Sequence, residues 1–314
     1  MLFGDIPGGH REDIIEDWIM YSIDDVPVFA RIGRNDDVTN TFHEWRIDRR
    51  RDRGANRQLD GFRTADLRPV AVIDQETASN TTQIMTAAVE ESTTKQILSQ
   101  KGGIVSTRDI FARNSLKALQ ALTTDVNFEC MNGVRTGAAV QPRGMAGLMD
   151  QAAWVVPFAA IPQFQLNVVT AVAGTGITRD AIVLSQQAAY NDGRKPDIFF
   201  VSSDGKLDIA NLTQNIRRVN PESTNRRFAE GIDYFESDFG VIEIVMERNI
   251  PADTGGFEQA FMMSSETVDI AYVHSAMWVR SGIDGDSAIG WWRLECTLEM
   301  REPYANVIIE NISR

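Results

Sequence analysis

The chain has 314 residues, a length that predicts about two domains of roughly 150 residues each. Its hydrophobic fraction of 43% and charged fraction of 24% are typical of a folded globular protein, and they exclude wholesale disorder, a collagen-like chain and a disulfide-stapled miniprotein. The net charge of −13 argues against a protein whose whole surface binds nucleic acid. No apolar run reaches the roughly 18 residues that span a bilayer, and the first residues predict no signal peptide, so we expect no membrane association.

The basic residues are nearly all arginine, 26 against five lysines. Arginine makes planar, bidentate bonds to carboxylates, so an acidic chain rich in arginine hints at ion pairing between proteins. The two cysteines, Cys130 and Cys296, lie far apart in the sequence and fit no metal or redox spacing. We therefore expect two free thiols in a reducing environment.

Residues 11–34 predict a helix followed by a short second turn. Ile14, Ile15, Trp18 and Ile19 share one apolar face, and Pro27 interrupts the pattern. The segment is either a helix that packs on the chain's own core or an arm that packs on a neighbouring subunit. The pattern favours neither interpretation.

The stretch 39–69 is the most unusual part of the sequence. Residues 46–68 hold eight arginines and four aspartates, so they carry a charge of +4 and leave −17 on the rest of the chain. Because few apolar residues occur here, the stretch cannot bury a core, and it predicts an extended loop or a long hairpin that stands away from the body. Nucleic-acid contact through residues 49–53, contact with an acidic neighbour and a solvated charged loop are the three open interpretations.

Residues 82–105 predict an extended stretch followed by a loop at Gly102 and Gly103. The strongest helical pattern follows over 106–131, where Ser106 or Thr107 is the expected N-cap and Asn132 precedes the glycine that ends the helix. Its apolar stripe is Ala112, Leu116, Leu119, Thr123, Val126 and Cys130. Core packing therefore explains Cys130 better than reactivity does.

Helices and strands alternate in the second half of the chain. We expect one helix over 178–190 and another from Asp204 through Leu207, Leu212 and Ile216. We expect strands at 197–202, 231–236, 241–247, 267–280, 289–301 and 305–312, with turns at 237–240 and 283–287. The strand at 241–247 carries apolar residues on both faces in places. The mixture lacks a strict βαβ repeat, which predicts an α+β fold.

The sequence holds no motif of a catalytic or cofactor site. The dinucleotide fingerprint fails because position 179 is Arg, and no phosphate-binding loop, nucleophile elbow or zinc-protease motif occurs. His10, His43 and His274 are too few and too scattered for a metal site. His43 and Glu44 are adjacent in an extended segment and point to opposite sides, and 284–286 fits a hairpin turn better than a calcium loop. We expect no enzyme, cofactor or metal.

Several short stretches, each weak alone, form a distinctive set through their order and spacing from about residue 12 to 312. They are DDVPVF at 24–29, IGR at 32–34, TNTFHEW at 39–45, NTTQI at 80–84, KPDI at 195–198 and SDFG at 237–240, followed by Tyr272, Ile289, Leu298, Glu299 and Asn306. The set resembles the major capsid proteins of tailed bacteriophages, more narrowly a podovirus-like subfamily, which share their fold with encapsulins.

The resemblance implies the following division of the chain. An N-terminal arm takes 1–40 and an extended loop 41–80. A peripheral domain with a long spine helix takes 81–155 and 261–314, and an axial domain takes 156–260. Pentamers and hexamers of such subunits build an icosahedral shell around double-stranded DNA.

Charge then suggests what the loop contacts. A loop rich in arginine that meets a body of −17 favours pairing with carboxylates of an adjacent subunit over binding to DNA. The expected contact residues between subunits are Arg46, Arg49, Arg50, Arg51, Arg53 and Arg57.

The resemblance also implies partners and a location. We expect other copies of the chain, a portal protein, a cementing or decoration protein, and packaged DNA held without sequence-specific contact. Because only about 40 residues precede the extended loop and they match the arm, we expect a separate scaffolding protein. Assembly is expected in the host cytoplasm and the mature protein in the virion. An encapsulin-like shell around cargo protein and a soluble enzyme with an unrecognised site are the alternatives.

Some relatives join their subunits by an isopeptide bond between a lysine on the extended loop and an asparagine on a neighbour. That reaction needs a neutral amine, which arginine cannot supply because its guanidinium stays protonated. The first lysine of this chain is Lys95, beyond the expected loop, so we expect a shell held by non-covalent contacts.

Overall fold

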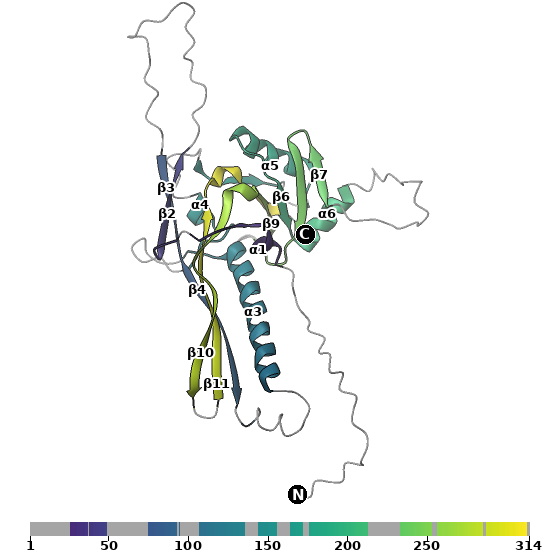
Figure 1. Cartoon of the computed structure of the whole chain (residues 1–314). Coiled ribbons are helices and arrows are strands. Elements are labelled where there is room, and N and C mark those ends of the chain that lie inside the picture. The colour runs from purple at the N-terminus through teal and green to yellow at the C-terminus, as the bar shows by residue number, and fades with distance from the viewer. Residues whose placement is uncertain are drawn as a thin grey trace, which may run out of the picture.

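The computed structural model describes residues 26–36, 38–48, 75–92, 94, 107–135, 144–155, 164–171, 176–212, 233–252, 256–284 and 287–312. These residues form a four-stranded sheet, a six-stranded sheet and a separate two-stranded hairpin, together with several helices (Figure 1). The mixture of helices with largely antiparallel sheets confirms the α+β expectation. The helix expected near Ile14 and the loop expected at Gly102 lie outside the described residues.

The first sheet has the strand order β1-β10-β11-β4. Its members are β1 (Gly33–Asn35), β10 (Val268–Asp284), β11 (Ser287–Met300) and β4 (Gln83–Ser92). β10 and β11 pair as a long antiparallel hairpin whose last pair is Asp284 with Ser287, which confirms a hairpin turn at this position. β4 adds along the other side of β11 and confirms the extended stretch expected after residue 82.

The long helix α3 (Thr107–Asn132) runs alongside this sheet, as Figure 1 shows, and it ends before Gly133 as expected. At 1.5 Å per residue its length is about 39 Å. Val126 and Cys130 are buried on its inner side. Leu116 was expected on the same stripe, but its side chain is 53% exposed. The indole Nε1 of Trp292 donates to the carbonyl oxygen of Ser115 at 2.8 Å, so the large ring lies against the helix backbone here and Leu116 turns to solvent.

The second sheet has the order β5-β12-β9-β6-β8-β7. Its strands are β5 (Asn167–Thr170), β12 (Val307–Ile312), β9 (Glu258–Met263), β6 (Ile198–Val201), β8 (Gly240–Met246) and β7 (Tyr234–Ser237). β9 and β12 belong to this sheet although the expected domain boundary at residue 260 assigns 261–314 to the part with the long helix. The domain division itself stays a prediction.

The central strands of the second sheet are apolar on both faces because each face lies against a different core. In β6, Phe200 belongs to the core shared with the first sheet, whereas Phe199 and Val201 belong to a second core. In β8, Val245 packs in the shared core and Ile244 in the second one, which confirms the two apolar faces expected for this strand.

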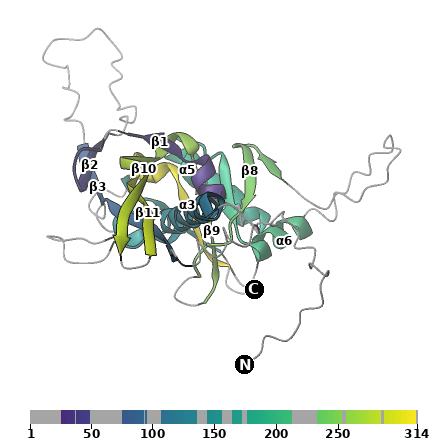
Figure 2. The same ribbon diagram turned by 60° about the horizontal axis from the view of Figure 1, so that its bottom comes forward.

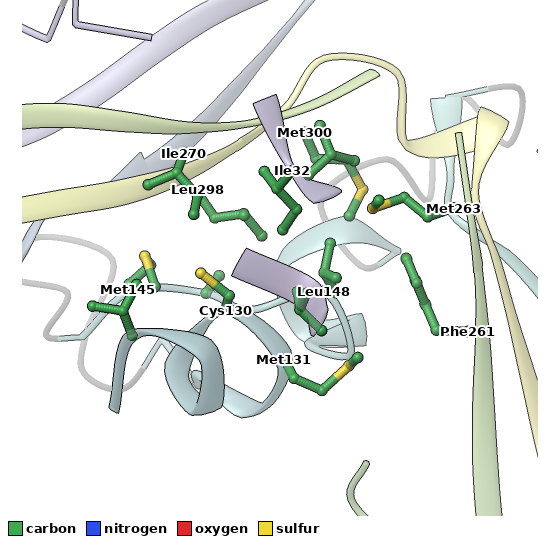
Figure 3. Packing of buried hydrophobic residues seen from close by; sticks show 14 of the residues in the cluster. Ile32, Cys130, Met131, Met145, Leu148, Phe261, Met263, Ile270, Leu298 and Met300 are labelled. Carbon is green, nitrogen blue, oxygen red and sulfur yellow. The ribbon is translucent and has the colours of Figure 1, made fainter. Parts of the chain in front are cut away.

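Figure 3 shows the shared core, where side chains from both sheets and from α3 meet. Cys130, Leu148, Phe261, Leu298 and Met300 are each 0% exposed there. Burial of apolar area at about 25 cal/mol per Å² is the main force that holds the two sheets together. The sheets therefore share one continuous core across the described residues.

Two helices accompany the second sheet, α5 (Arg179–Asn191) and α6 (Ser203–Leu212). Thr178 caps α5 as expected, since its Oγ1 accepts from the backbone N–H of Ala181 at 3.2 Å. The helix expected from Asp204 is confirmed as α6, in which Leu207 is 63% exposed and Ile209 is buried. Ile216, expected at the end of this helix, lies outside the described residues.

The remaining helices are short: α1 (Pro27–Arg31), α4 (Gln151–Trp154), and the 3-10 turns η5 (Ser265–Thr267) and η6 (Pro303–Ala305). Pro27 begins α1 rather than interrupting a helix, because its fixed φ and missing N–H suit the first helical position. Asn127 of α3 accepts from the N–H groups of Val28 and Phe29 and so satisfies this helix end. No helix among the described residues is long and apolar enough to cross a membrane.

Candidate inter-subunit interface

The two-stranded hairpin is a separate small sheet that lies at one side of the body. β2 (Phe42–Asp48) and β3 (Gln75–Thr81) pair antiparallel from Phe42 with Thr81 to Asp48 with Gln75, and they join neither of the larger sheets. Figures 1 and 2 show them at one side of the molecule, away from α5 and α6. The described strands agree with a long hairpin over part of the expected loop.

An isolated two-stranded hairpin has marginal stability in water, so its contacts with the body decide its position. Four consecutive residues of β11 supply such contacts. Thr297 donates from Oγ1 to the Thr81 carbonyl at 3.0 Å, and the Leu298 carbonyl accepts from Asn80 at 2.8 Å. The Glu299 carboxylate lies 3.3 Å from His43 Nε2, and the Met300 carbonyl accepts from the Trp45 indole at 3.1 Å.

We call these contacts, together with those that the same hairpin residues make to segment 144–148, the hairpin root. Thr81 Oγ1 donates to the Gly144 carbonyl at 2.5 Å, and Asn80 exchanges hydrogen bonds with the backbone of Ala146. The guanidinium of Arg135 donates to the carbonyl oxygen of Ser79 at 3.0 Å. The root thus joins both hairpin strands to the body.

A small apolar cluster supports the root. Ile47 and Ala78 from the hairpin pack with Phe164 and Tyr304 of the body, and all four are buried. Trp45 lies between this cluster and the shared core, with its ring centroid 6.1 Å from that of Trp154. The hairpin is therefore anchored by apolar burial as well as by hydrogen bonds.

A charged cluster surrounds the Glu299 side chain at the edge of the root. Asn35 Nδ2 donates to this carboxylate at 3.2 Å and Arg301 Nε at 3.1 Å, and Arg301 also forms a close ion pair with Asp269. Burial raises the pKa of the Asp269 carboxyl, while the Arg301 charge acts to lower it and the Glu299 charge to raise it. His43 also belongs to this cluster, because its ring contacts the Glu299 carboxylate and not that of its sequence neighbour Glu44.

Of the six arginines expected at the subunit contact, the structure describes Arg46. It lies on β2 opposite Thr77, and its side chain is exposed. The other five, Arg49, Arg50, Arg51, Arg53 and Arg57, lie outside the described residues. The sequence assigns no role to the root residues Asn80 and Thr297, because the residue type alone does not show whether an asparagine or threonine is buried. Asn80 belongs to the run NTTQI, which contributes to the family resemblance but does not indicate what the side chain contacts.

A second set of exposed side chains lies on the six-stranded sheet and its helices. Large apolar groups face solvent there, namely Leu184 and Tyr190 on α5, Leu207 on α6, Tyr234 on β7 and Val241 on β8, with exposed fractions of 53, 50, 63, 65 and 54%. Only a contiguous patch of such side chains marks a surface that other proteins cover, so these residues are candidates for contact one by one.

No cluster of His, Cys, Asp and Glu side chains in the described ranges could hold a metal ion. The arrangement can make contacts, through a hairpin with an anchored root at one side of the body and through exposed apolar side chains.

The model of the SU10 major capsid protein family matches residues 6–313. The fold is similar to a subunit of the Cyanophage A-1(L) capsid asymmetric unit, with a TM-score of 0.67, 12% identity, and coverage of 92% of this chain and 93% of that chain. It is also similar to the capsid of a native GTA particle, with a TM-score of 0.63, 12% identity and coverage of 95% and 93%.

The holo-SrpI encapsulin complex from Synechococcus elongatus PCC 7942 is a further structural neighbour, with a TM-score of 0.57, 11% identity and coverage of 90% of this chain and 86% of that chain. At sequence identities of 11–12%, these structural similarities show that the fold is shared and nothing beyond the fold. No curated protein sequence matches the chain.

Proposed function

This chain belongs to the SU10 major capsid protein family and is a structural, non-enzymatic protein of the virion's capsid shell. From that premise we propose that pentamers and hexamers of the chain close into an icosahedral shell around double-stranded DNA. The hairpin β2–β3 is the observation that carries the proposal. It joins neither of the larger sheets and lies at one side of the molecule, where we place a contact with another copy of the chain.

Charge supports a neighbouring subunit as that partner. Residues 46–68 carry +4 and the rest of the chain −17, so arginines on one copy meet an acidic surface on the next. An exposed ion pair contributes only about 0 to 1 kcal/mol, but each shell repeats it many times. We assign the contact to Arg46, Arg49, Arg50, Arg51, Arg53 and Arg57.

The domain names implied by the resemblance fit this proposal. Residues 1–40 act as an arm and 41–80 as an extended loop. The part with the long helix, 81–155 and 261–314, lies at the capsomer periphery, and 156–260 lies near its axis. The exposed Tyr234 and Val241 belong to the axial part, where symmetry-related copies would cover them.

Further partners follow from a shell that packages DNA. We propose a separate scaffolding protein during assembly in the host cytoplasm, a portal protein at one vertex and a cementing or decoration protein on the outside. A net acidic subunit repels phosphate, so packaged DNA is held without sequence-specific contact and moves freely during packaging and ejection.

The proposal is tested by co-expressing the chain with its scaffolding protein and examining the product by sedimentation and electron microscopy. We expect closed shells. A species of 35 kDa alone at high concentration would contradict the assembly, and uniform shells of correct size formed without any scaffolding protein would contradict the need for one.

The loop contact has its own test. The triple variant Arg49→Ser, Arg50→Ser, Arg51→Ser should lower the yield of shells. A control variant with Arg179→Ser, Arg248→Ser and Arg280→Ser removes the same charge from exposed positions of the body. We expect its yield of shells to be higher than that of the loop variant. Normal assembly of the loop variant combined with loss of DNA retention would assign the arginines to DNA instead.

A nanocompartment shell around cargo protein is the second candidate, favoured by the similarity to an encapsulin complex. The two functions differ in what the shell encloses. Nuclease-protected double-stranded DNA inside purified particles supports the phage capsid, and a single enclosed protein species supports the nanocompartment.

A further inference from the structure

Segment 144–148 lies between the hairpin and the end of the long helix. Leu148 N–H donates to the Cys130 carbonyl at 2.8 Å, and Gly147 N–H donates to the Gly133 carbonyl at 2.7 Å. The approach is close enough to exclude a side chain, because a Cβ on Gly147 would lie 2.7 Å from the Gly133 nitrogen. The segment is thus fixed to the C-terminal end of α3.

Asn80 connects the hairpin to this segment and to the first sheet through one side-chain amide. Its Nδ2 donates to the carbonyls of Leu298 at 2.8 Å and of Ala146 at 3.1 Å, and its Oδ1 accepts from the N–H of Ala146 at 2.9 Å and of Thr81 at 2.9 Å. Two carbonyl acceptors on one side and two N–H donors on the other leave the amide a single orientation. The side chain is 0% exposed.

The hairpin has no ladder to either large sheet, so its direction depends on the root. Thr297, His43 and the Trp45 indole bond the hairpin to β11. Single bonds from Thr81 to Gly144 and from Arg135 to Ser79 attach it elsewhere on the body. The Asn80 amide makes three bonds to the body and joins the hairpin to β11 and to segment 144–148 at once, and through that segment to α3. Attachments that lie on different elements restrict rotation more than attachments along a single strand.

We propose that Asn80 is the positioning residue that fixes the hairpin at one angle to α3, so that its outer part is directed at the neighbouring subunit before assembly. The inference rests on the proposed role of the hairpin in contacting another copy. Preorganisation of this kind lowers the entropy that the chain loses on association. Loss of Asn80 leaves two carbonyls and two N–H groups buried without this partner, and the remaining contacts of the root then hold the hairpin over a wider range of angles.

The test compares Asn80→Ala with Asn127→Ala. Asn127 is a matched control because it is also 0% exposed and also joins distant segments, accepting from Val28 and Phe29 and donating to Glu247, but it does not contact the hairpin. Spin labels on Thr77→Cys and Ala121→Cys, both at exposed positions, report the distance from the hairpin to α3 in the full-length, unassembled subunit. Shell yield is measured on the unlabelled variants.

We expect both variants to lose stability, and only Asn80→Ala to broaden the label distance distribution and to reduce shell yield several-fold at a temperature where both are folded. If Asn80→Ala does not fold, Asn80→Ser, whose hydroxyl keeps one donor and one acceptor, is measured in the same way. A distribution as narrow as that of the wild type overturns the positioning role and leaves the proposed shell contact standing. A broadened distribution with normal shells overturns the role of the hairpin in assembly.

Discussion

Buried asparagines join segments of this protein that are far apart in the sequence. Asn80, Asn127 and Asn306 are each 0% exposed, and each uses both ends of its amide. Asn306 accepts from the N–H of Ser264 and donates to the carbonyl of Glu302, so it connects β9 to the start of β12. A buried amide with all its bonds made specifies one arrangement of the chain, because any other leaves polar groups without partners.

The two thiols should be unreactive in the folded subunit. Burial raises the pKa of Cys296 to about 12 and that of Cys130 well above its usual range, so the reactive thiolate is absent at neutral pH. Titration with a disulfide reagent should therefore give no fast reaction in native protein and two equivalents after denaturation. Fast modification of one thiol in the native state would contradict this burial.

The carboxyl of Glu129 should make stability depend on pH. Burial raises its pKa, a hydrogen bond with Gln83 opposes the shift, and the Asp125 charge adds to it. Because the folded state binds this proton more tightly than the unfolded state, the contribution to stability is complete below the model-peptide pKa of 4.5 and is lost as pH rises through the folded pKa.

The variant Glu129→Gln should therefore unfold at higher denaturant concentration than the wild type at pH 7, and the difference should vanish below pH 4.5. Chemical denaturation of unassembled subunits at both pH values measures it. The same substitution at the exposed Glu236 serves as the control. A difference that persists unchanged at low pH would assign the effect to packing.

At the scale of elements, the strands that read as apolar runs are those placed between two cores. In β9, Ala260 and Met262 face the second core, whereas Phe261 and Met263 face the shared one. β7 lies at the edge of the same sheet, and its side chains alternate between exposed and half-buried. Position in the sheet, rather than intrinsic propensity, thus decides the composition of each strand.

Helix α5 should depend on its N-cap. Thr178→Ala removes the side chain that accepts from Ala181 N–H, and we expect a loss of about 1 kcal/mol in the free energy of unfolding. Thr123→Ala makes the same chemical change inside α3, where the hydroxyl bonds the Leu119 carbonyl within its own helix. That control should stay within about 0.5 kcal/mol of the wild type, because alanine is a better helix former there. Equal losses would contradict the capping role.

At the scale of the whole molecule, a shell of this chain should be held by non-covalent contacts. The expected loop, 41–80, contains no lysine, so the amine needed for an isopeptide bond is absent from it. Mature particles boiled in detergent and reducing agent should run as one band near 35 kDa. A ladder of linked subunits would refute the prediction.

Elements with local signals can be predicted from the amino-acid pattern alone. The three-to-four spacing and the terminal Asn132–Gly133 predicted α3 to within a residue at each end, and Thr178 predicted the start of α5. The charge contrast between residues 46–68 and the rest predicts a segment without a core of its own, and most of that segment lies outside the described residues. Periodicity and capping act within a few residues, so they can be read from the chain alone.

Which faces are buried and what anchors the hairpin depend on contacts between segments that are distant in the sequence. Leu116 fits the apolar stripe of the long helix but faces solvent, because burial depends on what lies opposite in space. Asn80 contacts Ala146 and Leu298, residues 66 and 218 positions away. A hydrogen bond at such a separation leaves no periodic trace in the sequence, since its partners come together only when the two sheets and the long helix have packed.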